Sequence, residues 1–179
     1  MSENKDVYAQ SKSQMRLSER IVAALPGFRG YKEKELRRES DKLVRNNLTL
    51  KLTKDKDSVK SISQKVADKR YMDVLTDVDR LTAKMDRITE KVNHASYGYA
   101  GFYDIVKIKE ENLDRMITFD NQLLDEVNAL TAAIEDLKTQ LLSNNFANLK
   151  DKIQAITDKF ELLEDTFDKR EQVILGVTQ

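Results

Sequence analysis

Few side chains in this chain of 179 residues are of the types that carry out acid–base, nucleophilic or metal chemistry. There is one histidine, His94, and no cysteine, which excludes thiolate metal sites and disulfides and disfavours histidine-based zinc sites or triads. Di-iron helical bundles use inward-facing glutamates with a Glu-x-x-His motif, but Glu90 precedes His94 by four positions and no second such pair exists. We therefore expect no catalytic, cofactor-binding or metal-binding residues and no small-molecule substrate.

Three other charged residues, Lys109, Asp120 and Arg170, interrupt stripes of apolar residues. A buried charge without a partner is costly, so we expect Asp120 and Arg170 to pair across an interface between helices. Such pairs set the register of packed helices more often than they catalyse reactions. Lys109 is expected to lay its stem along the stripe and to place its ammonium at the edge.

Two segments concentrate glycine and aromatic residues, "LPGFRGY" at 25–31 and "HASYGYAGFYD" at 94–104. Gly98 falls between two apolar stripes, so the second segment is expected to be a turn that projects from the end of a helical rod. Its aromatic side chains need a cover, supplied either by the first segment or by a partner. The candidate contact residues in the two segments are Phe28, Tyr31, Tyr97, Tyr99, Phe102 and Tyr103.

The apolar stripes themselves keep a spacing of alternating three and four residues, which is typical of packed or coiled helices. Charged residues make up 35% of the chain and there is a single proline, a balance that also favours long helices. We predict an all-α protein, an elongated antiparallel three-helix bundle or coiled coil. Its helices are expected at about residues 58–96, 99–142 and 145–175.

Additional N-terminal helices are predicted at about residues 7–25 and 31–52, separated by a turn that Pro26 imposes. The domain organisation is therefore an amphipathic helix and turn at 1–30, a charged helix and linker at 31–57, and the bundle at 58–179. Two arrangements fit residues 31–57. A turn at 53–57 folds the charged helix back along the rod, or one straight helix runs from 31 to 95.

Both glycine-aromatic segments also carry a resemblance. The run "LPGFRGYKEKELRRESDKLVR" followed much later by "HASYGYAGFYDIVKIKEENLDRMITFD" resembles an uncharacterised family of small prokaryotic helical proteins. The likeness covers about a quarter of the chain. It implies no activity and assigns no functional residue, but it does imply that the two segments belong together.

Charge is unevenly distributed, since residues 1–55 hold 13 Lys or Arg against 8 Asp or Glu and residues 56–179 hold 18 against 23. Arg37 and Arg38 lie on a basic side of the charged helix, but glutamates interleave with them and no nucleic-acid-binding motif is present. We expect a protein partner, which includes a second copy of the chain, and no nucleic acid.

The function predicted from these features is that of a non-enzymatic coiled-coil scaffold or adaptor in the cytoplasm. The alternative is peripheral association with an anionic membrane, because Arg16 and Arg20 accompany Ile21, Val22 and Leu25 on the first helix. In the competing interpretation these apolar residues pack on the rod. No run of 18 apolar residues is present to span a bilayer.

Overall fold

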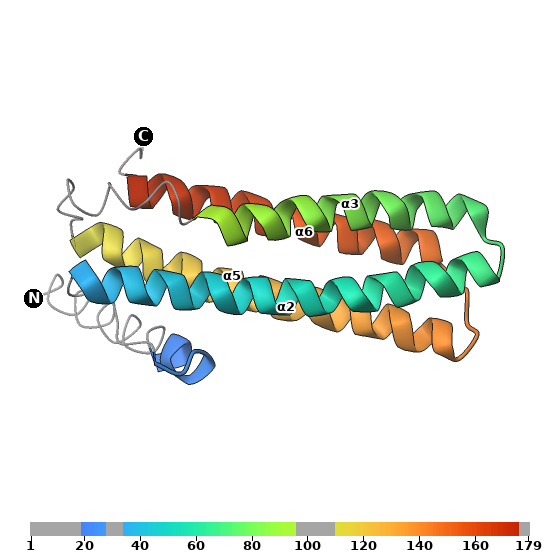
Figure 1. Ribbon diagram of the computed structural model, residues 1–179, viewed down its shortest axis with the longest axis horizontal. Coiled ribbons are helices and arrows are strands. Elements are labelled where there is room, and N and C mark those ends of the chain that lie inside the picture. The colour runs from blue at the N-terminus through green and yellow to red at the C-terminus, as the bar shows by residue number, and fades with distance from the viewer. Residues whose placement is uncertain (1–18, 28–33, 96–109, 176–179) are drawn as a thin grey trace, which may run out of the picture.

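Four long helices account for most of the chain in the computed structural model (Figure 1). They are α2 (Lys34–Asp68), α3 (Met72–His94), α5 (Glu110–Leu142) and α6 (Leu149–Leu175). The structure describes residues 19–27, 34–95 and 110–175, with side chains from residue 39 in α2, from 114 in α5 and as far as 173 in α6. A short helix covers residues 19–24. The predicted all-α helical bundle is confirmed.

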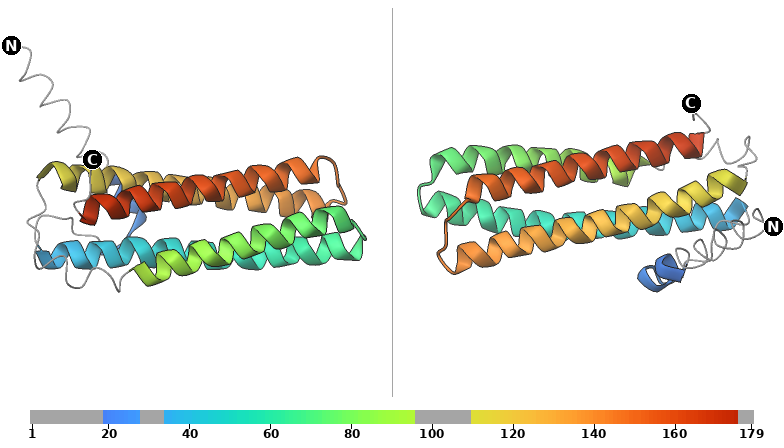
Figure 2. Two further views of the ribbon diagram at one scale, coloured as in Figure 1. Left: turned by 90° about the horizontal axis from the view of Figure 1, so that it is seen from above. Right: turned by 180° about the vertical axis from the view of Figure 1, so that it is seen from behind.

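The long helices form two hairpins that lie one on the other. α2 pairs with α3, and α5 pairs with α6, while α2 also packs on α5 and α3 on α6. α2 and α5 run in one direction and α3 and α6 in the other (Figures 1 and 2). The starts of α2 and α5 therefore share one end of the rod, and α3 ends short of it (Figures 1 and 2).

The described bundle has four long helices rather than the predicted three, because α2 does not break at residues 53–57. The core side of α2 follows Leu48, Leu52, Asp55, Val59 and Ile62, all of which are buried. These steps of three and four residues are unbroken, and no glycine or proline interrupts them. Because Asp55 is charged, a count of apolar residues alone does not show that this row is continuous. The boundary predicted at 57/58 consequently lies inside α2.

The predicted single helix at about 58–96 is also wrong, because the chain reverses at residues 69–71. Arg70 has a φ of +59°, and its N–H donates to the carbonyl of Ala67 at 2.9 Å. The N–H of Tyr71 donates to the carbonyl of Val66 at 3.2 Å. This pair of bonds is the Schellman motif that ends many helices. It separates α2 from α3 and also rules out a straight helix from 31 to 95.

The second reversal lies where the sequence predicted it, at residues 143–148. Asn144 has a φ of +56°, and the N–H groups of Asn144 and Asn145 donate to Leu141 and Gln140, each at 3.0 Å. The same Schellman arrangement thus ends α5. Because the chain reverses at this turn, Arg170 of α6 lies level with Asp120 of α5, as their predicted pairing requires.

The two hairpins pack without an axial shift between them. Across α2 and α5, Lys51 bonds with Asn128 and Ser58 with Glu135, at a separation of 77 residues in each pair. Across α3 and α6, Lys84 bonds with Glu161 at the same separation. Both turns consequently meet at one end of the rod. There the rings of Tyr71 and Phe146 stack with centroids 5.0 Å apart.

The described part of the N-terminal helix ends as predicted, at the proline–glycine turn. Residues 19–24 are helical, and Gly27 follows with a φ of +92°. A side chain at this φ would be strained, which suits the position to glycine. A Cβ built on Gly27 would lie 3.8 Å from Cδ1 of Leu43, so this turn rests on α2.

Candidate functional site

A cluster of charged side chains is buried in the bundle, and it contains the predicted pair. Arg170 of α6 donates from Nε to Oδ1 of Asp120 on α5 at 2.5 Å. Both side chains are shielded from solvent. The contact predicted from the interrupted stripes is therefore present, and it joins α5 to α6 deep inside the protein.

Two residues of α2 complete this cluster and were not predicted to belong to it. Asp41 approaches Arg170 at 2.9 Å and pairs with Arg45, four residues along the same helix, at 2.8 Å. The four side chains hold two negative and two positive charges, so the cluster is neutral as a whole. Buried charges require such compensation. The arrangement holds three helices in one register and presents none of its groups to solvent.

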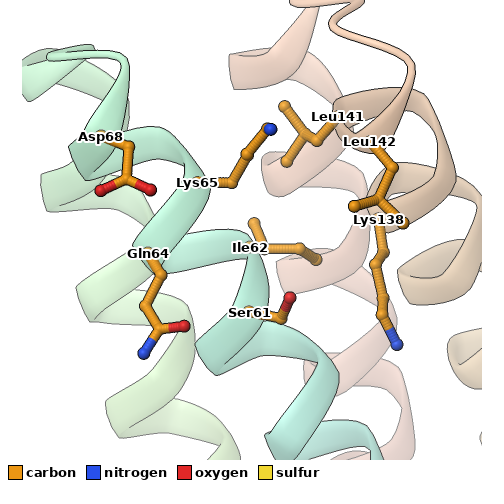
Figure 3. A pocket seen from close by; sticks show the side chains of 8 residues that line it. All are labelled: Ser61, Ile62, Gln64, Lys65, Asp68, Lys138, Leu141 and Leu142. Atoms are coloured by element: carbon orange, nitrogen blue, oxygen red, sulfur yellow. The ribbon is translucent and has the colours of Figure 1, made fainter.

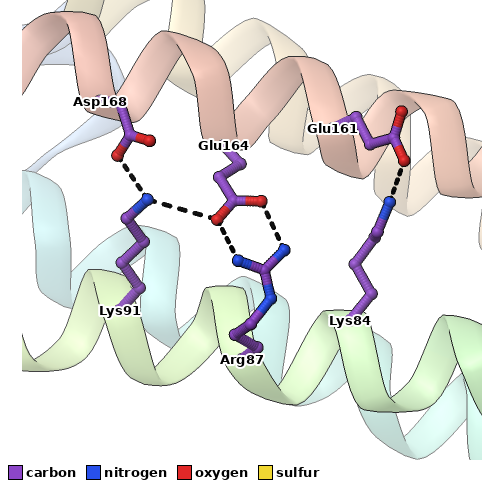
Figure 4. A network of polar contacts seen from close by, with 6 residues as sticks. All are labelled: Lys84, Arg87, Lys91, Glu161, Glu164 and Asp168. Atoms are coloured by element: carbon purple, nitrogen blue, oxygen red, sulfur yellow. Dashed lines mark hydrogen bonds and ion pairs between the residues drawn. The ribbon is translucent and has the colours of Figure 1, made fainter.

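A row of ion pairs joins α3 to α6 (Figure 4). All its bases lie on α3 and all its acids on α6. Arg87 makes two hydrogen bonds to Glu164, which hold the pKa of that carboxyl below its ordinary value of 4.5. Burial alone would lower the pKa of Lys91, but hydrogen bonds to Asp168 and Glu164 more than offset it, so the pKa is raised. This row of ion pairs favours one alignment of α3 along α6, and so one arrangement of the two hairpins.

Within the described part of the chain, two acidic side chains inside the bundle, Asp55 and Glu126, have no basic hydrogen-bonding partner. Burial raises the pKa of Asp55, although a hydrogen bond from Thr131 at 2.7 Å opposes the shift. Burial also raises the pKa of Glu126, against hydrogen bonds from Gln122 and Thr166. Perturbed carboxyls of this kind can mark functional sites, but Asp55 and Glu126 each lie between packed helices rather than beside a cavity.

Three of the six large apolar side chains that are exposed among the described residues lie at the turn end of the rod. Met72 and Leu142 are 63% and 61% exposed, and Tyr71 is also exposed. Beside them is an open hollow of about 160 Å³ between α2 and α5. Lys65 points across it towards Leu141 (Figure 3). Lys69 lies 5.9 Å from the centroid of the Phe146 ring, a cation–π distance.

The residues predicted to contact a partner are not among those whose side chains the structure describes. Six of them and Lys109 fall outside the described residues, and so do the side chains of Arg37 and Arg38 in α2. The six are Phe28, Tyr31, Tyr97, Tyr99, Phe102 and Tyr103. The sequence did not predict the turn-end surface, because arginine is not a usual turn residue and Arg70 gave no signal of a turn. Without that turn, Tyr71 and Met72 are expected in the middle of a helix.

His94 is the last residue of α3, and its Nε2 lies 2.9 Å from a carboxylate oxygen of Glu90. Within the parts of the chain that the structure describes, no group of three histidine or acidic residues is arranged to hold a metal ion. Over the same residues, no helix combines the length and the apolar character that a membrane span needs.

The apolar face of the short N-terminal helix is turned towards the bundle. Ile21 and Leu25 are buried, whereas Val22 is exposed. Arg20 donates two hydrogen bonds to Asp125 of α5, at 2.7 and 2.9 Å. These contacts agree with the interpretation in which this helix packs on the rod.

Comparisons with protein-family models, with curated proteins and with solved structures found no match to this chain.

Proposed function

We propose that this protein is a non-enzymatic helical scaffold or adaptor that binds another protein through the turn end of the rod. The observation that carries the proposal is the gathering of Tyr71, Met72 and Leu142 at this end, with their side chains exposed. Large apolar side chains that are exposed together mark interaction surfaces more often than isolated ones do. Aromatic residues and methionine are also enriched in protein interfaces.

The charges around this surface indicate the chemistry of the partner. Lys65, Lys69 and Arg70 flank the exposed apolar side chains, with Asp68 and Asp73 as the nearby acids. Among the described residues Lys65 has no ion pair, and its ammonium reaches into the hollow beside Leu141 (Figure 3). A partner segment with apolar side chains and a carboxylate would complement this surface.

The rest of the rod supports a structural role. Two of its deeply buried ions, Asp120 and Arg170, neutralise each other, and its α3–α6 ion pairs hold the two hairpins together. Membrane association was the alternative prediction. It requires the apolar face of the first helix, but Ile21 and Leu25 of that face are buried against the bundle. Protein binding is therefore the function that we propose.

The test compares two double variants with the same chemical change. Met72→Glu with Leu142→Glu places charge on the turn end, whereas Leu50→Glu with Leu162→Glu places it on exposed leucines elsewhere on the rod. Tagged proteins are expressed in the native cells at native level, and co-purifying proteins are identified by mass spectrometry. We expect the wild type and the Leu50/Leu162 variant to retain the same partner and the turn-end variant to lose it.

All three proteins should show the same helical circular dichroism, because the substituted residues are exposed. Recovery of the same partner with all three would show that the turn end is not the binding surface. Recovery of no protein above an untagged control, even with the wild type, would contradict the scaffold function itself.

A further inference from the structure

Polar pairs recur across α2 and α5 at steps of seven residues on each helix. They are Lys51 with Asn128 and Ser58 with Glu135. The next step of seven places Lys65 level with Leu142, whose side chain offers no acceptor to an ammonium. Lys65 forms no hydrogen bond or ion pair with the described residues. The row therefore ends on a lysine whose position across the interface is apolar.

The missing acceptor coincides with the open hollow between the two helices (Figure 3). The volume of this hollow is about 160 Å³, and Ile62, Leu141 and Leu142 contribute its apolar lining. Because a cavity of roughly 150 Å³ accommodates benzene, the hollow has the room that an aliphatic side chain needs. Leu142 is 61% exposed, so its apolar wall is accessible from outside.

Two lysines lie along the α2 side of the hollow. The N–H of Lys69 donates to the carbonyl of Lys65 at 3.3 Å, so the two residues are one helical turn apart. Both extend from α2 towards α5, since Lys65 points towards Leu141 (Figure 3) and Lys69 lies 5.9 Å from the centroid of the Phe146 ring. Neither lysine forms an ion pair with the described residues.

The other charged groups of the lining do not neutralise these lysines. Lys138 is itself a base, and its ammonium is held at 3.1 Å from Ser58 and 3.4 Å from Glu135. Asp68 forms no ion pair with Lys65, and its carboxylate points away from that ammonium (Figure 3). The hollow thus combines an apolar lining with uncompensated positive charge at its edge.

We propose that this hollow receives an acidic amphipathic helix of the partner protein. An aliphatic side chain of that helix occupies the hollow, and two carboxylates one turn apart accept hydrogen bonds from Lys65 and Lys69. Helices dock in grooves through residues at such spacings, and opposite charges at the edge select the correct partner. The assignment rests on the proposed function, because it specifies which segment of a partner the turn end binds.

A phage library of helical peptides tests this chemistry on the full chain. Two positions four residues apart vary among Glu, Gln and Lys, and the neighbouring positions vary among Leu, Ala and Ser. The baits are the wild type, Lys65→Glu with Lys69→Glu, and a control that reverses two exposed lysines away from the hollow, Lys54→Glu with Lys159→Glu. We expect the wild type and the control to enrich Glu at both positions beside Leu, and the Lys65/Lys69 variant to enrich Lys there.

Fluorescence anisotropy with an enriched peptide measures the contribution of its carboxylates. Replacing both Glu residues by Gln should weaken binding to the wild type about fivefold, the effect of two exposed ion pairs. Added salt should reduce this difference, because charges at a surface are screened. The matching Lys peptide should bind the Lys65/Lys69 variant more tightly than it binds the wild type, a gain that damage to the fold could not produce.

Peptides without an excess of Glu, or peptides that bind the wild type and the Lys65/Lys69 variant equally, would overturn the acidic helix. If those peptides still lose binding to Met72→Glu with Leu142→Glu, the turn end remains a protein-binding surface and the proposed function stands. No enrichment over the starting library would also overturn the acidic helix, whereas recovery of the native partner decides the scaffold function separately. A wild-type dimer in light scattering that dissociates in the Lys65/Lys69 variant would overturn a foreign partner and identify the occupant as a second copy of this chain.

Discussion

Asp55 occupies a position on α2 at which the pattern calls for an apolar residue. Its carboxylate accepts a hydrogen bond from Thr131, while Lys51 and Lys54 favour its charged form and Glu135 opposes it. Burial outweighs the favourable contacts, so the pKa is raised above its ordinary value of 3.8. In the folded protein this group therefore holds its proton to a higher pH than in the unfolded chain.

The sign of the resulting pH dependence follows from linkage. A raised carboxyl pKa adds stability at low pH, and that stability is lost as the pH rises through the folded-state value. At neutral pH the charged Asp55 therefore lowers the free energy of unfolding. We expect Asp55→Asn to raise the unfolding free energy at pH 7 by about 1 kcal/mol, the size of a typical single-residue effect. The gain should disappear in acid, where Asp55 itself is neutral.

Guanidinium unfolding between pH 3 and pH 7 measures this difference. Asp57→Asn is the matched control, because Asp57 lies on the same helix with its side chain 77% exposed. We expect the control to leave stability unchanged within about 0.5 kcal/mol. A loss of stability in Asp55→Asn at pH 7 would mean that the charged carboxylate stabilises the interface between α2 and α5.

The buried pair of Asp120 and Arg170 shows how far the sequence could predict the candidate site. When two apolar stripes are joined by a short turn, the position of that turn determines which residues of the two helices face each other. This register places Asp120 and Arg170 side by side. Asp41 and Arg45 could not be placed in the same way, because their helix packs on α5 between the two hairpins and reaches Arg170 of α6 through an ion pair, with no short turn to set the register. Spacing within a hairpin carries no information about a third helix.

The two helix reversals differ in how clearly their residue types predict them. Asparagine adopts a positive φ more readily than most residues, so Asn144 in "SNN" predicts the turn that the structure contains. Arg70 takes up the same conformation without being a residue that favours it. Its helix ends where the apolar stripe slips in phase between Val66 and Tyr71, and spacing alone does not distinguish a slip within one helix from a break between two.

The conformation of Arg70 makes a prediction about the turn between α2 and α3. Arg70 is exposed, and its side chain makes no ion pair or hydrogen bond with the described residues that substitution would remove. Glycine adopts a φ of +59° without the clash that a Cβ creates, a cost of roughly 1–2 kcal/mol. We expect Arg70→Gly to raise the free energy of unfolding by about 1 kcal/mol, measured by chemical denaturation.

The control for this turn is Ala67→Gly, in the last turn of α2. Glycine there should lower stability by about 1 kcal/mol, because the backbone is helical and loses more freedom on folding. Opposite signs for two glycine substitutions three residues apart would identify the left-handed conformation as the cause. Destabilisation by both would mean that the side chain of Arg70 stabilises the turn more than its backbone strains it.

At the scale of the whole molecule, the two hairpins are matched along their full length. The separation of 77 residues recurs across α2–α5 and across α3–α6. Equal register at both interfaces brings the turns together, and the stacked rings of Tyr71 and Phe146 join them. The internal core is one continuous cluster that includes residues of all four long helices. These features couple the hairpins and favour unfolding in a single step.

The chain has no tryptophan, so Tyr71→Trp introduces a single tryptophan whose fluorescence reports on the junction of the two turns. Tyr71 is 44% exposed, which leaves room for the larger ring. If the hairpins unfold as one unit, tryptophan fluorescence and far-UV circular dichroism should report the same denaturant midpoint.

Adding Glu164→Gln to this variant, which weakens the α3–α6 ion pairs at the middle of the rod, should lower both midpoints together. The expected loss is up to about 1 kcal/mol, as for partly exposed pairs. A fluorescence change that precedes the loss of helix would instead show that the hairpins separate at the turn end while each remains helical, and an adaptor built in that way would open where we propose that its partner binds.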